Sequence, residues 1–366
     1  MNVNKKIFFV EIAVILFISS VLSGCSSYSK DSSAQIKQSD RVREVKTLNV
    51  AEYSVLGHSI QRFEKNPQRV IADGLGETEM VLAFADPETI LAVYGFYNLH
   101  DFVKPQFKEK LNKLHILKQG ETNKELILSL QPDLIIAEQC SFVTKSLGTT
   151  EFWNKRGIKT YVPANTNSPG KHIVKESIEI EKQYIRDFGI IFGKEKLADM
   201  YVKDIEQTLQ FFQKRAKNGS KQRVMVVENF GKTIASYDKT KLVGDMVLRL
   251  GGTIPETQPI LGEEDFLQEN PDIIFVVCSD GDRGKCMEFF LRKPQFRTIN
   301  AIKRKKVYSI ELESMYGAGL RVKDGLERIG LALYPEFEEE YRSTQNNTIN
   351  PSYIDWLDYK SAADIE

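Results

Sequence analysis

One segment of the chain occurs twice, and this repeat limits the possible folds more than any other feature of the sequence. The first copy, residues 125–136, reads ELILSLQPDLII, and the second, residues 264–275, reads EDFLQENPDIIF. Each copy predicts a short helix that stops at its Pro-Asp pair, because proline lacks an amide hydrogen and clashes with the preceding turn. The continuous apolar run that follows is typical of a strand covered on both faces, as in a parallel sheet. Each copy therefore belongs to a parallel α/β sheet.

A shorter repeat indicates where each sheet begins. Gln68–Ile71 and Gln222–Met225 read QRVI and QRVM, and each begins an apolar strand after a polar stretch. Apolar runs then alternate with segments of helical spacing, which predicts two similar lobes. The predicted strands lie near 70–72, 90–93, 134–137 and 160–162 in the first lobe and near 224–227, 234–237, 273–277 and 307–310 in the second.

A long amphipathic segment connects the two lobes. Ser168 and Pro169 can begin a helix, because proline is tolerated where the amide is unpaired, and Gly193 ends it. A second helix, Lys194–Arg215, leads into the second lobe. Further predictions are helices at 242–250 and 322–333, and a β-hairpin at 47–63 that turns near Gly57.

The N-terminus has the layout of a secretory signal. Two lysines precede an apolar run at 7–22, interrupted by Glu11, and the run ends in Leu22-Ser23-Gly24-Cys25. This ending resembles the lipobox of bacterial lipoproteins, which implies cleavage before Cys25 and acylation of that cysteine with diacylglycerol and a further chain such as palmitate. Two chains give stable membrane anchoring. A buried helix or a membrane span is the alternative, but the run is shorter than the roughly 20 residues that a span needs.

These features divide the chain into six parts. Residues 26–43 are rich in Ser, Lys, Gln and Asp and bury too little apolar surface to order themselves. We expect a signal peptide at 1–24, a lipidated flexible linker at 25–46, an N-terminal lobe at 47–170, a spanning helix at 171–193, a C-terminal lobe at 194–343 and a C-terminal tail at 344–366.

The charge balance and the histidines argue against two kinds of partner. Basic and acidic residues number 50 each, so the net charge is zero, and nucleic acid is disfavoured. Bare zinc or manganese sites usually need clustered histidines. The four histidines, His58, His100, His115 and His172, are widely scattered.

The cysteines do not predict a disulfide framework. With Cys25 acylated, the odd number Cys140, Cys278 and Cys286 remains. Cys278 ends an apolar strand and is predicted to be a small buried apolar residue. Pairing of Cys278 with Cys286 across a loop is the alternative.

Two α/β lobes joined by one long helix, on a lipid anchor, resemble the substrate-binding lipoproteins of ABC importers for iron–siderophore complexes, haem and cobalamin. The resemblance covers about residues 47–340 and depends on five local marks in the correct order. It implies two Rossmann-like lobes with parallel sheets, one spanning helix and a ligand cleft between the lobes. The marks are Pro67–Ile71, Gly76–Glu79, the two Pro-Asp strands, Lys306–Ile310 and Arg321–Leu326.

Ligand-binding residues are expected in the loops after the strands, since open α/β sheets bind ligands at the carboxyl ends of their strands. Aromatic faces with an arginine suit a large, partly aromatic, anionic ligand. For the aromatic residues and Met315 the alternative is ordinary packing, and for Arg321 it is a salt bridge to a surface carboxylate. The candidates are Tyr94, Phe96, Tyr97, Tyr237, Met315, Tyr316 and Arg321.

Two glutamates match the positions at which the family docks on its permease. Glu79 and Glu264 each lie near the start of a helix, one in each lobe, and the resemblance implies that they meet arginines of the membrane permease. Such complementarity sets orientation and encounter rate. A carboxylate that interacts with the helix dipole is the alternative, and the neighbouring Glu77 and Glu263 leave the assignment ambiguous.

The resemblance implies capture of a ligand and not catalysis, by a monomer that works with an ABC permease and its cytoplasmic ATPase. Its place is the outer face of the cell membrane, in a periplasm or at the cell surface. An Fe(III) chelate of the siderophore type is the first choice of ligand, and it needs no resident cofactor. Haem is second, and cobalamin would need a broad neutral pocket. Candidates for an axial haem ligand are Tyr94, Tyr97, His100, Met315 and Tyr316.

Hypotheses from two other classes remain. An anchored enzyme lacks support, because the sequence has no Gly-x-Ser-x-Gly elbow, His-Glu-x-x-His motif or phosphate loop. A membrane-anchored adhesion or signalling module with the same fold stays open.

Overall fold

The computed structural model describes residues 42–95, 99–118, 121–165, 175–216, 221–278, 283–345 and 348–351. They lie within one unit, Ser39–Glu366. The predicted signal peptide, the predicted acylation site Cys25 and the candidates Phe96 and Tyr97 lie outside the described residues.

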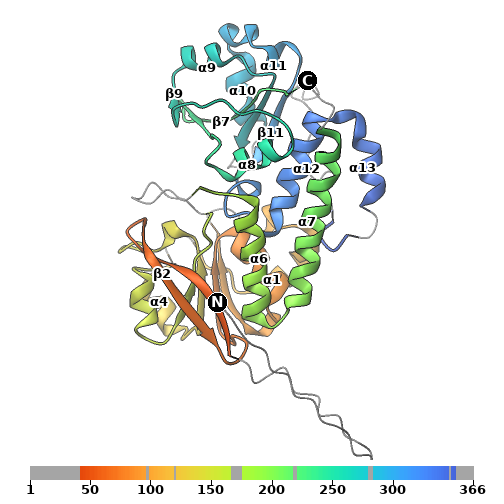
Figure 1. The fold of residues 1–366 in the computed structure, drawn as a ribbon. Coiled ribbons are helices and arrows are strands. Elements are labelled where there is room, and N and C mark those ends of the chain that lie inside the picture. The colour runs from red at the N-terminus through yellow and green to blue at the C-terminus, as the bar shows by residue number, and fades with distance from the viewer. Residues whose placement is uncertain are drawn as a thin grey trace, which may run out of the picture. The chain divides into compact units, whose positions relative to one another are not determined.

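Among the described residues, the first sheet has four strands, β3 (Val70–Asp73), β4 (Ile90–Tyr94), β5 (Leu134–Ala137) and β6 (Lys159–Tyr161). They are parallel, in the order β4-β3-β5-β6 (Figure 1). All residues of β3 and β5 are buried. Val70 and Ala72 enter one apolar core and Ile71 enters another, so both faces of the sheet are covered. The four predicted strands of the first lobe are confirmed.

In the part of the chain that the structure describes, the second sheet has five strands, β7 (Val224–Asn229), β8 (Ile234–Ser236), β9 (Ile260–Leu261), β10 (Ile273–Cys278) and β11 (Val307–Glu311). Their order is β11-β10-β7-β8-β9, with β11, β10 and β7 parallel. The expectation that this lobe repeats the first is wrong at one edge, where β8 and β9 are antiparallel to their neighbours. The link between β7 and β8 is a short turn, in which Phe230 donates its amide hydrogen to the carbonyl oxygen of Thr233. A parallel pair of strands needs a crossover connection of about a dozen or more residues, so this link is too short for a parallel pair.

The Pro-Asp repeat and the Gln-Arg repeat meet in the structure. Asp133 accepts hydrogen bonds from the backbone amides of Gln68 and Arg69, at 2.8 and 3.0 Å. In the second lobe, Asp272 accepts one from the amide of Arg223, at 3.1 Å. The aspartate of each Pro-Asp pair therefore fixes the start of the neighbouring strand, which explains why the two repeats occur together.

Helices surround both sheets, and three of them have a side-chain cap at the start. Asn123, Thr149 and Ser177 each accept a hydrogen bond from the amide three residues later. The α-helices are α1 (Leu75–Phe84), α2 (Leu99–Phe102), α3 (Lys108–Leu111), α4 (Lys124–Ser129), α5 (Thr150–Asn154), α6 (Ile178–Phe192), α7 (Glu195–Ala216), α8 (Leu242–Arg249), α9 (Glu263–Glu269), α10 (Arg283–Arg292), α11 (Asn300–Lys303), α12 (Val322–Leu333) and α13 (Glu338–Thr344). The 3-10 helices are η2 (Pro87–Thr89), η3 (Pro105–Phe107), η4 (Gln139–Ser141), η5 (Pro294–Thr298), η6 (Leu312–Ser314), η7 (Gly319–Arg321) and η8 (Pro335–Phe337).

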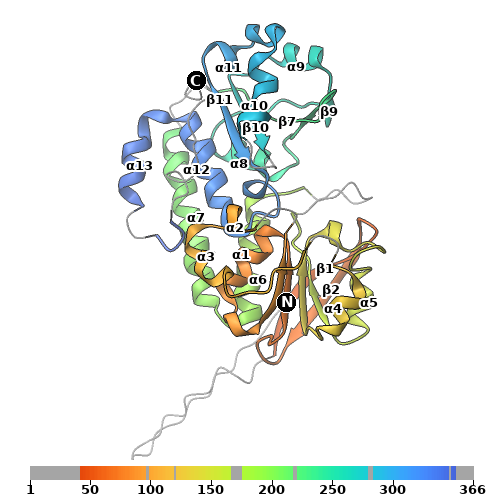
Figure 2. The same ribbon diagram turned by 180° about the vertical axis from the view of Figure 1, so that it is seen from behind.

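The connecting helix is shorter than predicted. Ser177 caps α6, residues 175–177 are not helical, and Gly193 ends the helix in a left-handed conformation, as the sequence predicted. The α6 helix contacts α1 of the first lobe and α8 of the second, and α7 lies beside both α6 and α12 (Figure 1, Figure 2). The connection between the lobes is therefore a pair of helices rather than one.

The N-terminal hairpin consists of β1 (Arg43–Ala51) and β2 (Ser54–Phe63). Its turn is at Glu52 and Tyr53, which both have positive φ, and not near Gly57. The first strand also begins within the predicted linker, because Val45 and Leu48 enter the apolar cores. Both expectations are thus corrected.

The structure pairs Cys278 with Cys286, with 5.8 Å between the two Cα atoms. Cys278 is buried at the end of β10, as predicted, but the preference for an unpaired thiol is wrong. Its partner Cys286 lies near the start of α10, close to the end of β10. Among the described residues, no helix has the length and apolar character needed to cross a membrane.

Candidate functional site

A cavity of about 280 Å³ lies where the strands of the two lobes end. Gly74, Gly95 and Glu138 follow β3, β4 and β5 of the first lobe, and Leu312 to Tyr316 follow β11 of the second. This is the place at which open α/β sheets bind ligands. We call this cavity the interlobe cleft. Its described lining residues are Gly74, Leu75, Gly95, Leu99, Phe102, Glu138, Cys140, Leu312, Glu313 and Tyr316.

Two glycines allow the first turn of α1 to form one wall of the cleft. Gly74 has φ 129°, and a Cβ there would lie 2.0 Å from Glu77 Oε2. A Cβ on Gly76 would lie 2.6 Å from the carbonyl oxygen of Gly317 in the other lobe. The two lobes therefore approach at backbone distance beside the cleft.

Carboxyl groups surround the interlobe cleft. Glu138 and Glu313 line it, Asp73 is buried at the end of β3, and Glu77 is buried in the first turn of α1. Burial raises the pKa of Asp73 to about 7, although a hydrogen bond from Ser141 opposes the rise. Burial also raises the pKa of Glu313 to about 7, although nearby Arg321 opposes it. These groups therefore resist ionisation while the cleft is empty.

Glu77 is the least satisfied of these carboxyl groups. Its side chain is 0% exposed, and neither carboxylate oxygen is hydrogen-bonded to another described residue. Burial and the neighbouring Glu138 raise its pKa well above the usual range. A buried polar group without a partner is unfavourable, so its presence needs an explanation.

The thiol of Cys140 also lines the cleft. It lies 3.4 Å from Glu138 Oε2 and is half-buried. Burial and the adjacent carboxylate raise the pKa of this thiol, which disfavours the nucleophilic thiolate.

Of the described aromatic candidates and Met315, only Tyr316 lines the interlobe cleft. Tyr94 and Met315 are buried in the apolar cores, in agreement with the packing alternative. The hydroxyl of Tyr237 donates a hydrogen bond to Glu228 at 2.6 Å, and its ring packs against the main core. The exposed His100 is not among the lining residues.

Arg321 and Glu79 are placed differently from the prediction. Arg321 Nη2 lies 2.7 Å from Glu79 Oε1, and Arg321 Nε lies 2.9 Å from Glu79 Oε2. The two side chains are 2% and 1% exposed. Glu79 therefore does not lie at the lobe surface, where docking on a permease needs it, and the guanidinium is held by a buried carboxylate. Glu264 on α9 is exposed, and its docking role stays a prediction.

A buried polar network, which the sequence analysis missed, continues from this ion pair. Lys104 lies 2.9 Å from Asp324, and Lys323 lies 3.0 Å from Asp204. Asn350 of the tail accepts a hydrogen bond from Lys104 Nζ at 2.8 Å, and its carbonyl oxygen accepts one from Lys323 Nζ at 2.6 Å. The network joins the first lobe, α7, α12 and the tail.

The acidic lining of the cleft is not among the residues predicted from the sequence. Glu138 directly follows the apolar strand of the first Pro-Asp copy. It is therefore expected near the ligand, because open α/β sheets bind ligands at the carboxyl ends of their strands. Glu77 lies two residues before Glu79, and Glu313 lies in the same loop as Met315 and Tyr316. The position of these carboxylates at strand ends is therefore visible in the sequence, but their burial beside the cleft is not.

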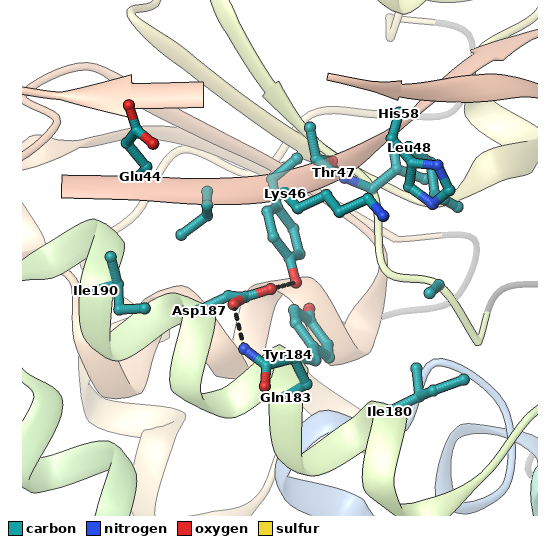
Figure 3. Close-up of a pocket in the computed structure, with 14 residues that line it drawn as sticks. Glu44, Lys46, Thr47, Leu48, His58, Ile180, Gln183, Tyr184, Asp187 and Ile190 are labelled. Atoms are coloured by element: carbon teal, nitrogen blue, oxygen red, sulfur yellow. Dashed lines mark hydrogen bonds between the residues drawn. The ribbon is translucent and has the colours of Figure 1, made fainter. Parts of the chain in front are cut away.

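A second cavity, of about 410 Å³, lies between the N-terminal hairpin and α6 (Figure 3). Tyr161 donates a hydrogen bond to Asp187 Oδ2, and Gln183 donates one to Asp187 Oδ1, both at 2.8 Å. Figure 3 shows Asp187 and Gln183 beneath Lys46 and Thr47 of β1. Asp187 is satisfied by these two bonds, and the cavity does not lie where the strands of the two lobes end, so it is a weaker candidate than the interlobe cleft.

Comparison with known proteins identifies the class. A model of the family described as "Periplasmic binding protein" matches residues 70–312. The chain therefore belongs to the periplasmic binding protein family.

Three similar proteins illustrate the match. The chain is 23% identical to an uncharacterized ABC transporter substrate-binding lipoprotein, YvrC, of Bacillus subtilis, over 90% of this chain and 98% of that one. It is 28% identical to the ferric-anguibactin-binding protein FatB of Vibrio anguillarum, over 84% of this chain and 91% of that one. A crystal structure of a periplasmic binding protein from Veillonella parvula is 24% identical, with a TM-score of 0.74, and covers 81% of this chain and 93% of that one. The structural likeness supports the two-lobed fold.

Proposed function

We propose that this protein captures a ferric chelate of the siderophore type outside the cytoplasmic membrane and delivers it to an ABC permease. The observation that carries the proposal is the interlobe cleft at the strand ends of a periplasmic binding protein. The name of FatB, a relative that spans most of both chains, supports a ferric chelate as the ligand.

The cleft suits a ligand that arrives with its iron already coordinated. In a chelate the donor atoms of the chelator surround Fe(III), so the protein needs shape and polar contacts instead of metal ligands. Phe102 and Tyr316 supply aromatic surface in the lining, and Glu138 and Glu313 supply acceptors for hydrogen bonds. The protein acts here by binding and release.

Titration of the full chain in detergent tests the proposal. Ferric hydroxamates, ferric catecholates, haemin and cobalamin are added separately, and intrinsic fluorescence is recorded. For at least one ferric chelate, we expect saturable quenching with a Kd below roughly 1 μM. A Kd of about 1 μM corresponds to a binding free energy of about 8 kcal/mol. The iron-free chelators are the control. If no ligand binds to folded protein, the adhesion or signalling hypothesis takes precedence.

Haem is the second candidate ligand, because the phenol of Tyr316 lines the cleft and is a possible axial ligand. Haemin should then give a shifted Soret band that Tyr316→Phe abolishes. A band identical to that of free haemin would remove this candidate.

The membrane anchor and the permease contact complete the proposal. Acylation of Cys25 would hold the protein at the membrane, and Cys25→Ala should release it into the soluble fraction. Docking on the permease would use the exposed Glu264. Glu264→Lys should reduce import of the chelate without changing its Kd, because rim charges act on encounter and orientation. A single cleft in each chain is sufficient for a monomer to carry one ligand.

A further inference from the structure

We propose that the interlobe cleft selects a ligand with a positively charged group, such as a protonated amine, which binds between the carboxylates of the two lobes. This inference rests on the proposed function, because it specifies the charge of the chelate that the protein captures. It also reverses the expectation of an anionic ligand, which depended on a cleft-facing Arg321.

Carboxylates line the cleft from both lobes. Glu138 follows β5 of the first lobe, and Glu313 lies in η6, after β11 of the second lobe. A cation between them would contact one acceptor from each lobe. Charge-assisted hydrogen bonds of this kind are roughly twice as strong as neutral ones.

At the same wall, Glu77 adds a buried acceptor that has no hydrogen bond to another described residue. A Cβ atom on Gly74 would lie 2.0 Å from Glu77 Oε2 and 3.4 Å from Glu138 Oε1. Gly74 lines the cleft, so its missing side chain leaves both carboxylates close to the cleft wall. Neither Glu77 oxygen has a hydrogen bond to another described residue, and the side chain is 0% exposed. A bound cation would satisfy this group.

The other charged groups near the cleft are already engaged. Arg321 is bonded to Glu79, and Lys104 is bonded to Asp324. Glu181 of α6 accepts hydrogen bonds from Asn165 Nδ2 at 2.7 Å and from the amide of Gly319 at 2.6 Å. Among the residues that the structure describes, the cationic side chains closest to the cleft are thus paired, while carboxylates at its wall keep unused acceptors.

The raised pKa values agree with this geometry. Burial raises the pKa of Asp73 and of Glu313 to about 7. Burial also raises the pKa of Glu138. A cation placed among these groups favours their ionised forms, so binding should release protons. An anionic chelate would instead need the carboxyl groups to stay protonated, and its binding would take up protons.

The test uses pairs of chelates that differ at one terminal group, which is a charged amine in one and a neutral acetamide in the other. A linear ferric trihydroxamate and a ferric catecholate are each prepared with a free terminal amine and with that amine acetylated. All four are titrated into the full chain in detergent by calorimetry, in two buffers of different ionisation enthalpy. For at least one chelator class, we expect the amine form to bind about tenfold more tightly or better, with release of protons, because a charge-assisted contact of about 1.4 kcal/mol is a factor of ten.

The outcomes separate the two proposals. If the acetylated forms bind as tightly as the amine forms, or proton uptake accompanies binding, the charge inference is wrong and the proposed function stands. If none of the four probes binds to folded protein, the proposed function fails, and the inference falls with it.

Isosteric variants locate the charge preference. Glu77→Gln and Glu138→Gln should each reduce the ratio of amine to acetylated affinity by about tenfold, and Glu313→Gln is a third variant. Glu88→Gln, an exposed glutamate outside the cleft lining, should leave the ratio unchanged. Glu77→Gln should also raise the Tm of the protein without ligand, because it removes a buried acid that no other described residue stabilises by a hydrogen bond. A lower Tm with an unchanged ratio would assign Glu77 a structural role and contradict the inference.

Discussion

Glu79 and Arg321 bond to each other through two hydrogen bonds, of 2.7 and 2.9 Å, in the interior between α1 and η7. Removing one partner of such a pair leaves the other charge buried and uncompensated, whereas replacing both partners together is far less harmful. This pair therefore belongs to the scaffold of the cleft. At the scale of single residues, the sequence specifies charge but not burial, which is why both side chains were assigned to surfaces that bind partners.

The first prediction concerns this pair. Glu79→Gln and Arg321→Met should each lower the free energy of unfolding by about 3–5 kcal/mol, and the double variant should be more stable than either single variant. Urea unfolding of the four proteins gives the coupling energy. Single variants within about 0.5 kcal/mol of the wild type, as is usual for surface substitutions, would show that the pair is not buried in solution.

The second prediction concerns pH. The folded protein raises the pKa of Asp73 from 3.8 to about 7 and that of Glu181 from 4.5 to about 7, in both cases by burial. Folded protein then holds protons that the unfolded chain releases, so this part of the stability is present at low pH and is lost as the pH rises from about 4 to 7.

We therefore expect a higher Tm at pH 5 than at pH 8 for the empty protein, with Asp73→Asn reducing the difference. Differential scanning calorimetry at both pH values measures this. A Tm that rises from pH 5 to pH 8, or an unchanged difference in the variant, would contradict the account.

At the scale of elements, the sequence predicted strands best where burial is continuous. β3, β5 and β10 follow polar or Pro-Asp stretches and consist almost entirely of buried apolar residues, so their runs were distinct. The hairpin turn was missed because Glu52 and Tyr53 take positive φ without a glycine. The two-residue β9 has no pattern of its own and exists through its pairing with β8. The local sequence pattern therefore predicts buried strands well, but it does not predict elements whose conformation depends on tertiary contacts.

The third prediction concerns the link between β10 and α10. Cys278 and Cys286 close a short loop, with a sequence separation of 8. Loss of the disulfide in Cys278→Ser/Cys286→Ser should lower the free energy of unfolding by about 2–3 kcal/mol, chiefly by freeing the unfolded chain. Thermal unfolding with and without reductant checks this. Cys140→Ser is the control, because Cys140 is a free cysteine, and reductant should still lower the Tm of that variant. A reductant-insensitive Tm in the wild type would contradict the pairing.

At the scale of the whole molecule, one polar network ties the lobes, the helix pair and the tail together. Lys104 comes from the first lobe, and its partner Asp324 comes from α12. Asp204 comes from α7. Asn350 accepts a hydrogen bond from Lys104 and donates its backbone amide hydrogen to Asp204. Asn350 places the described start of the tail within this network. Such a network restricts relative motion of the connected elements, which agrees with a modest closing movement on ligand binding.

The fourth prediction concerns this residue of the tail. Asn350→Ala removes an acceptor for Lys104 and the donor to Leu320 O, so it should cost about 1–3 kcal/mol of unfolding free energy. Asn112→Ala, at an exposed position, is the matched control and should have an effect within about 0.5 kcal/mol. Urea unfolding distinguishes the two. Equal effects would mean that the tail does not take part in the network.

The interlobe cleft as the place of capture is the central claim, and equilibrium dialysis with a radioactive ferric chelate tests it most directly. The wild type is compared with Tyr316→Ala, which removes an aromatic side chain from the cleft lining, and with Tyr53→Ala on the exposed hairpin turn. We expect a Kd about tenfold higher for Tyr316→Ala and an unchanged Kd for Tyr53→Ala. Equal binding by all three proteins would place the ligand elsewhere and contradict the account.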